Sequence, residues 1–97
     1  MKQAEEHNTI RRDVAVINKL GLHARPSAML VQLANGFKSN LFVTRDNGDE
    51  INAKSIMGVM MLAAAKGTIL QFRAVGADAA ELLDAVENLF KAKFNEE

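Results

Sequence analysis

Cysteine is absent from this 97-residue sequence, and histidine and proline are scarce. Without cysteine the protein can form neither a disulfide framework nor a thiolate, a composition that fits a reducing cytoplasm. Two histidines with no cysteine also argue against a structural zinc site. We therefore expect neither a bound metal ion nor a cofactor.

An excess of one charge sign and a long apolar run are missing as well. Twelve basic residues balance twelve acidic ones, whereas a nucleic-acid-binding protein usually carries net positive charge, so we expect no binding of nucleic acid. The longest apolar run, residues 56–65, is far shorter than the roughly 20 residues of a membrane-spanning helix. The first residues are polar and charged and contain no signal-peptide apolar segment. A cytoplasmic protein without membrane insertion is expected.

The length suits one domain with a modest core. We predict a flexible tail at residues 1–11, in which His7 has no role, and a single domain at residues 12–97. Strand patterns occur at residues 12–18, 40–46, 50–52 and 68–75, with a hairpin turn, DNGD, between the second and third. Helix patterns occur at residues 24–35, at residues 54–66, and after the cap pair Asp78 and Glu81 through Phe90.

The order β-α-β-β-α-β-α, with strands that alternate apolar and polar residues, indicates an α+β fold. We expect a two-layer open-faced sandwich of three helices on one four-stranded antiparallel sheet. In the first helix Pro26 suits the first turn, and Gly36 suits the position just after the last turn.

The segment GLHARP, residues 21–26, places a histidine where the first helix is expected to begin. A helix N-terminus offers unpaired N–H groups and the positive end of the dipole, which suit a bound or covalent phosphate. The same field disfavours an imidazolium, so a neutral His23 can attack phosphorus while Arg25 donates hydrogen bonds to the transferred group. The structural alternative is that His23 caps the helix or fills a turn and Arg25 is merely solvated.

Ser55 precedes residues 56–65, which contain no polar side chain, and it suits the N-cap of the second helix. A helix that is apolar on every side exposes part of that surface when it lies in a two-layer domain. Two interpretations remain open. Either this is a core helix with one or two exposed methionines, or Ile56, Met57 and Met60 form a docking patch of adaptable side chains.

GLHARP, followed at this separation by NAKSIMGVMMLAAAKG, closely resembles HPr, the histidine-containing phosphocarrier family of the bacterial phosphoenolpyruvate-dependent sugar phosphotransferase system. The resemblance extends from about residue 13 to the end of the chain. It implies that His23 accepts a phosphoryl group on Nδ1 from phosphorylated enzyme I and passes it to the A component of an enzyme II or of a regulatory branch. Such a protein is a monomeric phosphoryl-transfer intermediate and not a free-standing enzyme.

The resemblance also implies roles for the other candidate residues. Arg25 assists at the phosphoryl group, and Ser55 is the regulatory site used by HPr kinase/phosphorylase. The side chains of Ile56, Met57 and Met60 help to dock partner proteins.

Some segments point to another branch of the family. Leu20 stands where many sugar-type members carry a small polar residue, and INKLGLHARP, MLAAAKG and LFKAKFNEE are similar to the nitrogen-related branch, NPr. AKSIMGVM, by contrast, is similar to members that serine phosphorylation controls. A nitrogen-branch phosphocarrier with no role in sugar uptake is therefore an alternative.

Two further function classes can be weighed against the phosphocarrier. A serine hydrolase is not favoured, because neither Ser27 nor Ser55 lies in a nucleophile-elbow pattern and His23 is the only candidate base. A regulatory binding module, controlled through Ser55 but without phosphoryl transfer, is the stronger rival. We expect such a module to have a non-nucleophilic residue in place of His23, so the histidine favours the phosphocarrier.

Overall fold

A computed structural model describes residues 8–96, so His7 and most of the predicted tail lie outside the described residues. One antiparallel sheet has the strand order β1-β4-β2-β3. Its strands are β1 Thr9–Ala15, β2 Asn40–Arg45, β3 Ile51–Asn52 and β4 Ile69–Val75. The helices are α2 Ala24–Asn35, α3 Ile56–Met60 and α4 Ala79–Lys91, and a short 3-10 helix, η1 Lys93–Asn95, follows α4.

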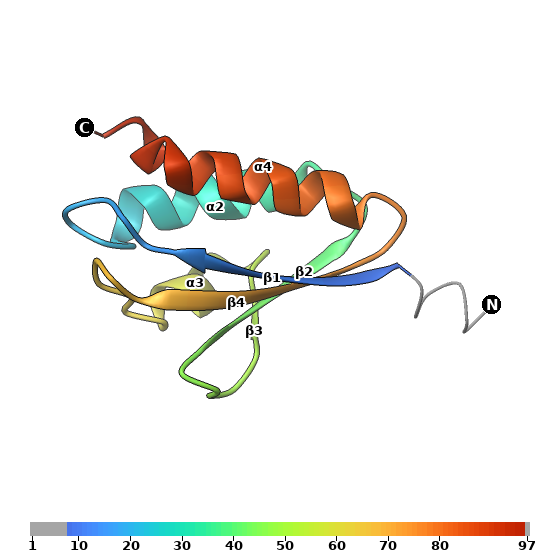
Figure 1. The fold of residues 1–97 in the computed structure, drawn as a ribbon, viewed down its shortest axis with the longest axis horizontal. Helices are drawn as coiled ribbons and strands as arrows, with labels where there is room; N and C mark the ends of the chain where they lie inside the picture. The colour runs from blue at the N-terminus through green and yellow to red at the C-terminus, as the bar shows by residue number, and fades with distance from the viewer. Residues whose placement is uncertain (1–7, 97) are drawn as a thin grey trace.

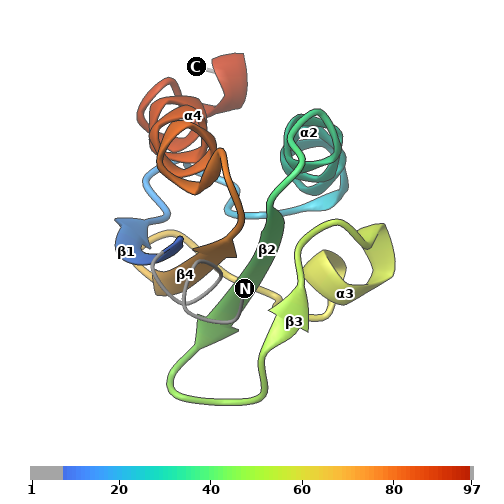
Figure 2. The same cartoon turned by 90° about the vertical axis from the view of Figure 1, so that its right-hand side faces the viewer.

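The elements form two layers, which confirms the predicted open-faced sandwich and its element order. Helices α2 and α4 lie side by side over one face of the sheet, and the short α3 lies beside β3 (Figures 1 and 2). No helix within residues 8–96 is long and apolar enough to cross a membrane.

Strand β4 lies in the middle of the sheet and shows why apolar and polar residues alternate along the strands. Its residues Leu70, Phe72 and Ala74 are buried, whereas Gln71 and Arg73 on the opposite face are only half-buried. The buried face packs against α4, where the ring of Phe90 lies 5.8 Å from that of Phe72, measured between centroids. Burial of these apolar side chains between the sheet and the helices is the main stabilising contribution to the fold.

The first strand corrects the predicted boundary. We expect a strand at residues 12–18 after a tail that ends at residue 11, but β1 begins at Thr9 and ends at Ala15. Each residue of β1 pairs with one of β4, from Thr9 opposite Val75 to Ala15 opposite Ile69. The length of β4 therefore decides where β1 starts and stops, and local strand propensity does not report this pairing. The division into a tail and one domain otherwise stays a prediction.

The second helix is much shorter than its sequence pattern suggests. A helix is predicted over residues 54–66, yet α3 covers only Ile56–Met60. Beyond it the chain leaves the helical conformation, and Ala63 adopts a left-handed φ of 47°. The guanidinium of Arg45 donates hydrogen bonds to the carbonyls of Leu62 and Ala63, at 2.6 and 2.9 Å. Tertiary contacts thus replace the helical hydrogen bonds that these carbonyls would otherwise accept.

The C-terminal end of α2 and the N-terminal end of α4 differ from the predicted capping arrangements. Gly36 directly follows α2, as expected, but its φ of −81° lies outside the left-handed region. Asp78 lies at the N-cap of α4, yet its carboxylate makes no capping hydrogen bond. It accepts instead from the hydroxyl and backbone N–H of Ser39 and from the backbone N–H of Lys38. These hydrogen bonds lower the pKa of Asp78 to about 2, and the bond from the Ser39 hydroxyl has the largest effect.

Candidate functional site

His23 lies at the N-terminus of α2, at the end of the loop that follows β1. Its backbone carbonyl accepts the first helical hydrogen bond, from Ser27 N at 3.0 Å, but its side chain makes no capping hydrogen bond. The imidazole is 38% exposed. The side chain of His23 therefore does not cap α2, whereas Arg25 is exposed, as the structural alternative also expects.

The loop before His23 is held from both sides. Leu22 is buried, and its N–H donates to the carbonyl oxygen of Ala64 at 2.8 Å. The carbonyl of Leu22 accepts from the hydroxyl of Ser27, which is itself buried in the first turns of α2, at 3.0 Å. Gly21 adopts a φ of +72°, a conformation that a side chain disfavours. These contacts hold the backbone of the loop that carries the His23 side chain.

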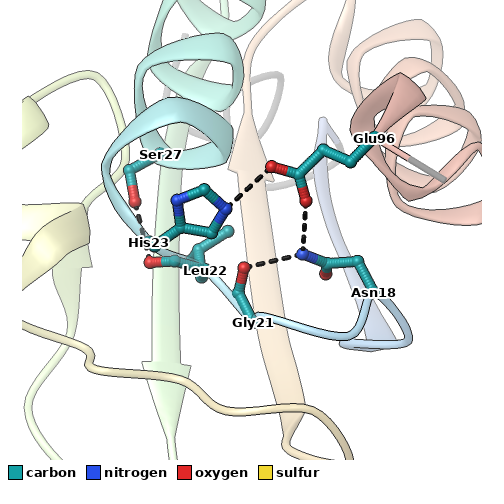
Figure 3. Close-up of polar contacts among 6 residues, drawn as sticks. All are labelled: Asn18, Gly21, Leu22, His23, Ser27 and Glu96. Atoms are coloured by element: carbon teal, nitrogen blue, oxygen red, sulfur yellow. Dashed lines mark hydrogen bonds and ion pairs between the residues drawn. The ribbon is translucent and has the colours of Figure 1, made fainter.

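The C-terminal segment brings a carboxylate to the histidine ring. Nε2 of His23 lies 2.7 Å from Oε2 of Glu96, and the amide nitrogen of Asn18 donates to Oε1 of the same carboxylate at 3.1 Å (Figure 3). The amide of Asn18, which is fully buried, also donates to the carbonyl of Gly21 at 2.7 Å. The second ring nitrogen, Nδ1, points away from Glu96 (Figure 3).

Sequence analysis missed both Asn18 and Glu96. Asn18 falls at the end of the predicted first strand, and Glu96 follows the last helix, 73 positions beyond His23. No local pattern connects residues so far apart. Only the packing of α4 beside α2 brings them together (Figure 1).

A surface hollow of about 550 Å³ lies beside the imidazole. It is lined by Lys19, Leu20, His23, Arg25, Asn95 and Glu96. The structure thus brings together His23 and Arg25, as expected, and adds a second basic side chain, Lys19. The side chain of Leu20 is 72% exposed at this hollow.

Ser55 is the N-cap of α3, as predicted. Its hydroxyl oxygen accepts a hydrogen bond from the backbone N–H of Gly58 at 3.3 Å. In the short helix that follows, only Val59 is buried. The exposed residues of the helix form an apolar surface made of Ile56, Met57 and Met60, with Met61 directly after the helix.

The exposure of these side chains bears on the two interpretations of α3. Met57 is 75% exposed, Met60 47% and Ile56 39%. Exposed large apolar side chains that gather in one place are typical of surfaces that bind partners. The three side chains are therefore accessible at the surface, and the docking role stays a prediction.

Known proteins are similar to this chain over most of its length. The family model described as "PTS HPr component phosphorylation site" matches residues 10–92. The chain belongs to the HPr family of phosphocarrier proteins. The phosphocarrier protein HPr of Neisseria meningitidis is 48% identical over 87 residues, which cover 90% of this chain and 97% of that protein. The phosphocarrier protein NPr of Escherichia coli is 38% identical over 89 residues, which cover 92% and 99%.

The fold agrees with the family. A crystal structure of HPr from Thermoanaerobacter tengcongensis matches with a TM-score of 0.86 and 42% sequence identity, covering 91% of this chain and 98% of that one. The HPr family match includes His23, Arg25 and Ser55, because all three lie within residues 10–92. Glu96 lies outside the matched range.

Proposed function

We propose that this HPr-family protein carries a phosphoryl group on Nδ1 of His23. The group comes from phosphorylated enzyme I, with phosphoenolpyruvate as the original donor, and passes to the A component of an enzyme II. The observation that carries the proposal is the exposed, non-capping imidazole at the N-terminus of α2, which shares a hollow with Arg25. The protein acts in the cytoplasm as a monomer and without a cofactor.

The surroundings of His23 suit this chemistry. The first backbone N–H groups of α2 have no intrahelical acceptor, and the helix dipole adds positive potential at the same place. Both favour a phosphoryl group there. The guanidinium of Arg25 can donate charge-assisted hydrogen bonds to phosphoryl oxygens. The third helical residue, Pro26, has no N–H and so leaves no further donor unpaired.

The test is phosphorylation by enzyme I. Incubation with enzyme I, phosphoenolpyruvate and Mg²⁺ should attach one phosphoryl group through a phosphoramidate bond, which acid hydrolyses, whereas a serine phosphate ester survives acid. His23→Ala should abolish this labelling, and Ser55→Ala, the matched control, should keep it. Full acid-labile labelling of His23→Ala would overturn the proposal.

The exposed surface of α3 supports a role in docking. Ile56, Met57 and Met60 present flexible apolar side chains that can adapt to pockets on different partners. We assign them to the contact with enzyme I and with the A component. Enzyme I delivers the phosphoryl group to His23 and the A component removes it from the same residue, so one adaptable surface serves both contacts.

Ser55 supplies the regulation. Ser55, the N-cap of α3, directly precedes Ile56 and Met57, so a phosphate added by HPr kinase/phosphorylase would place negative charge at the docking patch. The rival proposal, a regulatory module without phosphoryl transfer, has the same Ser55 but does not need an exposed imidazole at the N-terminus of α2.

We further propose that the protein acts in the sugar branch of the phosphotransferase system and not in the nitrogen-related branch. Identity is higher to HPr of Neisseria meningitidis, at 48%, than to NPr of Escherichia coli, at 38%, which supports the sugar branch. Phosphoryl transfer from the labelled protein to A components of both branches discriminates between them. Transfer to the nitrogen-branch component alone would favour the alternative without sugar uptake.

A further inference from the structure

We propose that Glu96 is a positioning residue of the phosphoryl-transfer site. Its carboxylate holds the His23 ring in the tautomer that carries the proton on Nε2, and this leaves the lone pair of Nδ1 available to phosphorus. The inference rests on the proposed function of His23, which it deepens by assigning a role to the C-terminal segment.

The contact itself defines the tautomer. Oε2 of Glu96 lies 2.7 Å from Nε2 of His23, a distance typical of a strong hydrogen bond. An ionised carboxylate can only accept hydrogen bonds, so Nε2 must donate and must therefore carry a proton. In a neutral imidazole the other nitrogen is then unprotonated. Nδ1 points away from the carboxylate and keeps its lone pair (Figure 3).

Asn18 holds the carboxylate in place. Its amide nitrogen donates to Oε1 of Glu96 and to the carbonyl of Gly21, and because both partners accept, the amide can have only this orientation. The Oδ1 atom of Asn18 is buried and has no hydrogen-bond partner within residues 8–96. A buried oxygen without a partner is unfavourable, so the two bonds that the amide nitrogen donates must offset it. The side chain of Glu96 is only 13% exposed.

The segment between α4 and Glu96 is built to turn back over the histidine. Lys93, Phe94 and Asn95 have left-handed φ angles of 53°, 55° and 60°, which are unfavourable for Lys93 and Phe94, while asparagine tolerates them. Phe94 is 2% exposed, and its ring centroid lies 4.8 Å from that of Phe90 in α4. Burial of this ring keeps the strained turn in place, and the turn positions the carboxylate of Glu96 beside Nε2 of His23.

The arrangement suits the transfer step. The lone pair of Nδ1 forms a bond to phosphorus while the bond from phosphorus to its donor atom on enzyme I breaks, and that electron pair stays with the donor. The proton on Nε2 is not released, so the ring gains positive charge next to the carboxylate of Glu96. The incoming phosphoryl oxygens are on the Nδ1 side of the ring. Arg25 and Lys19 are the basic side chains that line the hollow beside the imidazole, and either can offset negative charge on the phosphoryl oxygens.

Glu96→Gln is the informative variant because it keeps the size of the side chain. Asn18 still needs an acceptor, so the amide oxygen should turn toward Asn18 and the amide nitrogen toward Nε2 of His23. That nitrogen only donates, so it favours the tautomer with the proton on Nδ1, which blocks the nucleophile. Glu81→Gln is the matched control, because Glu81 lies in the first turn of α4, at the opposite end of that helix, and makes the same change of charge.

Imidazole ¹⁵N chemical shifts, measured on the isolated protein at a pH where His23 is neutral, report which nitrogen carries the proton. We expect protonated Nε2 in the wild type and in Glu81→Gln, and a shift toward protonated Nδ1 in Glu96→Gln. Phosphoryl transfer from enzyme I should slow about 10-fold or more in Glu96→Gln, because the wrong tautomer impairs catalysis in other histidine sites. Circular dichroism melts check that the variant is folded.

Two results would overturn the inference. One is a tautomer ratio that Glu96→Gln leaves unchanged. The other is an altered ratio with a wild-type rate of transfer, since positioning of this ring would then not matter to the reaction. The proposed function fails separately, if the wild-type protein takes up no acid-labile phosphoryl group, because the tautomer is measured without enzyme I.

Discussion

A β-carbon on Gly21 would lie 2.6 Å from the carbonyl oxygen of Ala64. That oxygen accepts the hydrogen bond from Leu22 N at 2.8 Å, so it cannot move away without loosening the loop that carries His23. Gly21 also has a φ of +72°, which adds a conformational cost for any other residue. The glycine of GLHARP therefore serves to let the histidine loop approach the segment after α3.

Gly21→Ala should destabilise the protein by about 3 kcal/mol, because steric overlap adds to the unfavourable φ. Gly67→Ala is the control, since Gly67 has a φ of +97° but nothing lies within 4 Å of the added β-carbon. It should cost only about 1 kcal/mol, the conformational part alone. Urea unfolding of both variants measures the difference. Equal losses would show that the contact with Ala64 does not constrain the loop.

Arg25→Ala should leave the fold intact, because Arg25 is exposed, and should slow phosphoryl transfer by about 10-fold or more. The reason is the loss of a guanidinium that stabilises charge on the phosphoryl oxygens. Arg25→Lys keeps the charge but not the forked donor geometry, and we expect it to recover only part of the rate. Rapid-quench measurement of transfer from enzyme I gives both rates. A wild-type rate for Arg25→Ala would reduce this side chain to a solvated surface residue.

Changing Met57 and Met60 to Glu should weaken binding to enzyme I without lowering the melting temperature. Met57 is largely exposed and Met60 about half exposed, so we expect both to contribute more to docking than to the core. Val59→Ala in the same helix should do the opposite, with about 2 kcal/mol less stability and nearly unchanged binding, because Val59 is fully buried. Titration calorimetry with enzyme I and thermal melts test both expectations. Loss of stability without loss of affinity in the methionine variant would contradict the docking role.

Phosphorylation of Ser55 should inhibit phosphoryl transfer without unfolding the domain. A phosphate adds about −1.5 to −2 charges at neutral pH, and at the N-terminus of a helix this charge is locally tolerated. Docking, however, must then bring the charge beside Ile56 and Met57 into an apolar contact, which costs binding energy. Ser55→Asp should reproduce part of the effect.

The measurement compares phosphoryl transfer from enzyme I to unmodified, Ser55-phosphorylated and Ser55→Asp protein, with circular dichroism melts of each. Equal rates would leave Ser55 a helix cap without regulatory effect. Slow transfer together with a collapsed melting curve would show that the phosphate acts on the fold and not on docking.

Asp78 should make stability depend on pH in the acid range. Hydrogen bonds from Ser39 and Lys38 lower its pKa from 3.8 to about 2, so the folded state favours the ionised carboxylate. This contribution is complete above the unfolded pKa of 3.8 and is lost as the pH falls to about 2. The melting-temperature difference between the wild type and Asp78→Asn should therefore be constant above about pH 5 and shrink below it. Asp49→Asn, at an exposed loop position, is the control and should not show this trend.

The sequence alone was sufficient for the element order, the layer architecture and the family. Helix α2 has its predicted bounds, residues 24–35, because its apolar stripe and Pro26 are local signals that do not depend on partners. The residues expected to carry the chemistry, His23 and Arg25, are close in the chain and share one surface hollow. Ser55 caps its helix for the same local reason.

Tertiary structure decided what depends on residues distant in the chain. The bounds of β1 follow its pairing with β4, and the early end of α3 follows the hydrogen bonds that Arg45 donates beyond it. The carboxylate of Asp78 binds Ser39 in place of its own helix because that turn lies beside it in the folded chain. The contact between Glu96 and His23 is the functional case, since 73 positions of sequence separate two atoms that lie 2.7 Å apart. Propensity and periodicity report only on neighbours in sequence, and this contact exists because buried Phe94 fixes where the chain returns.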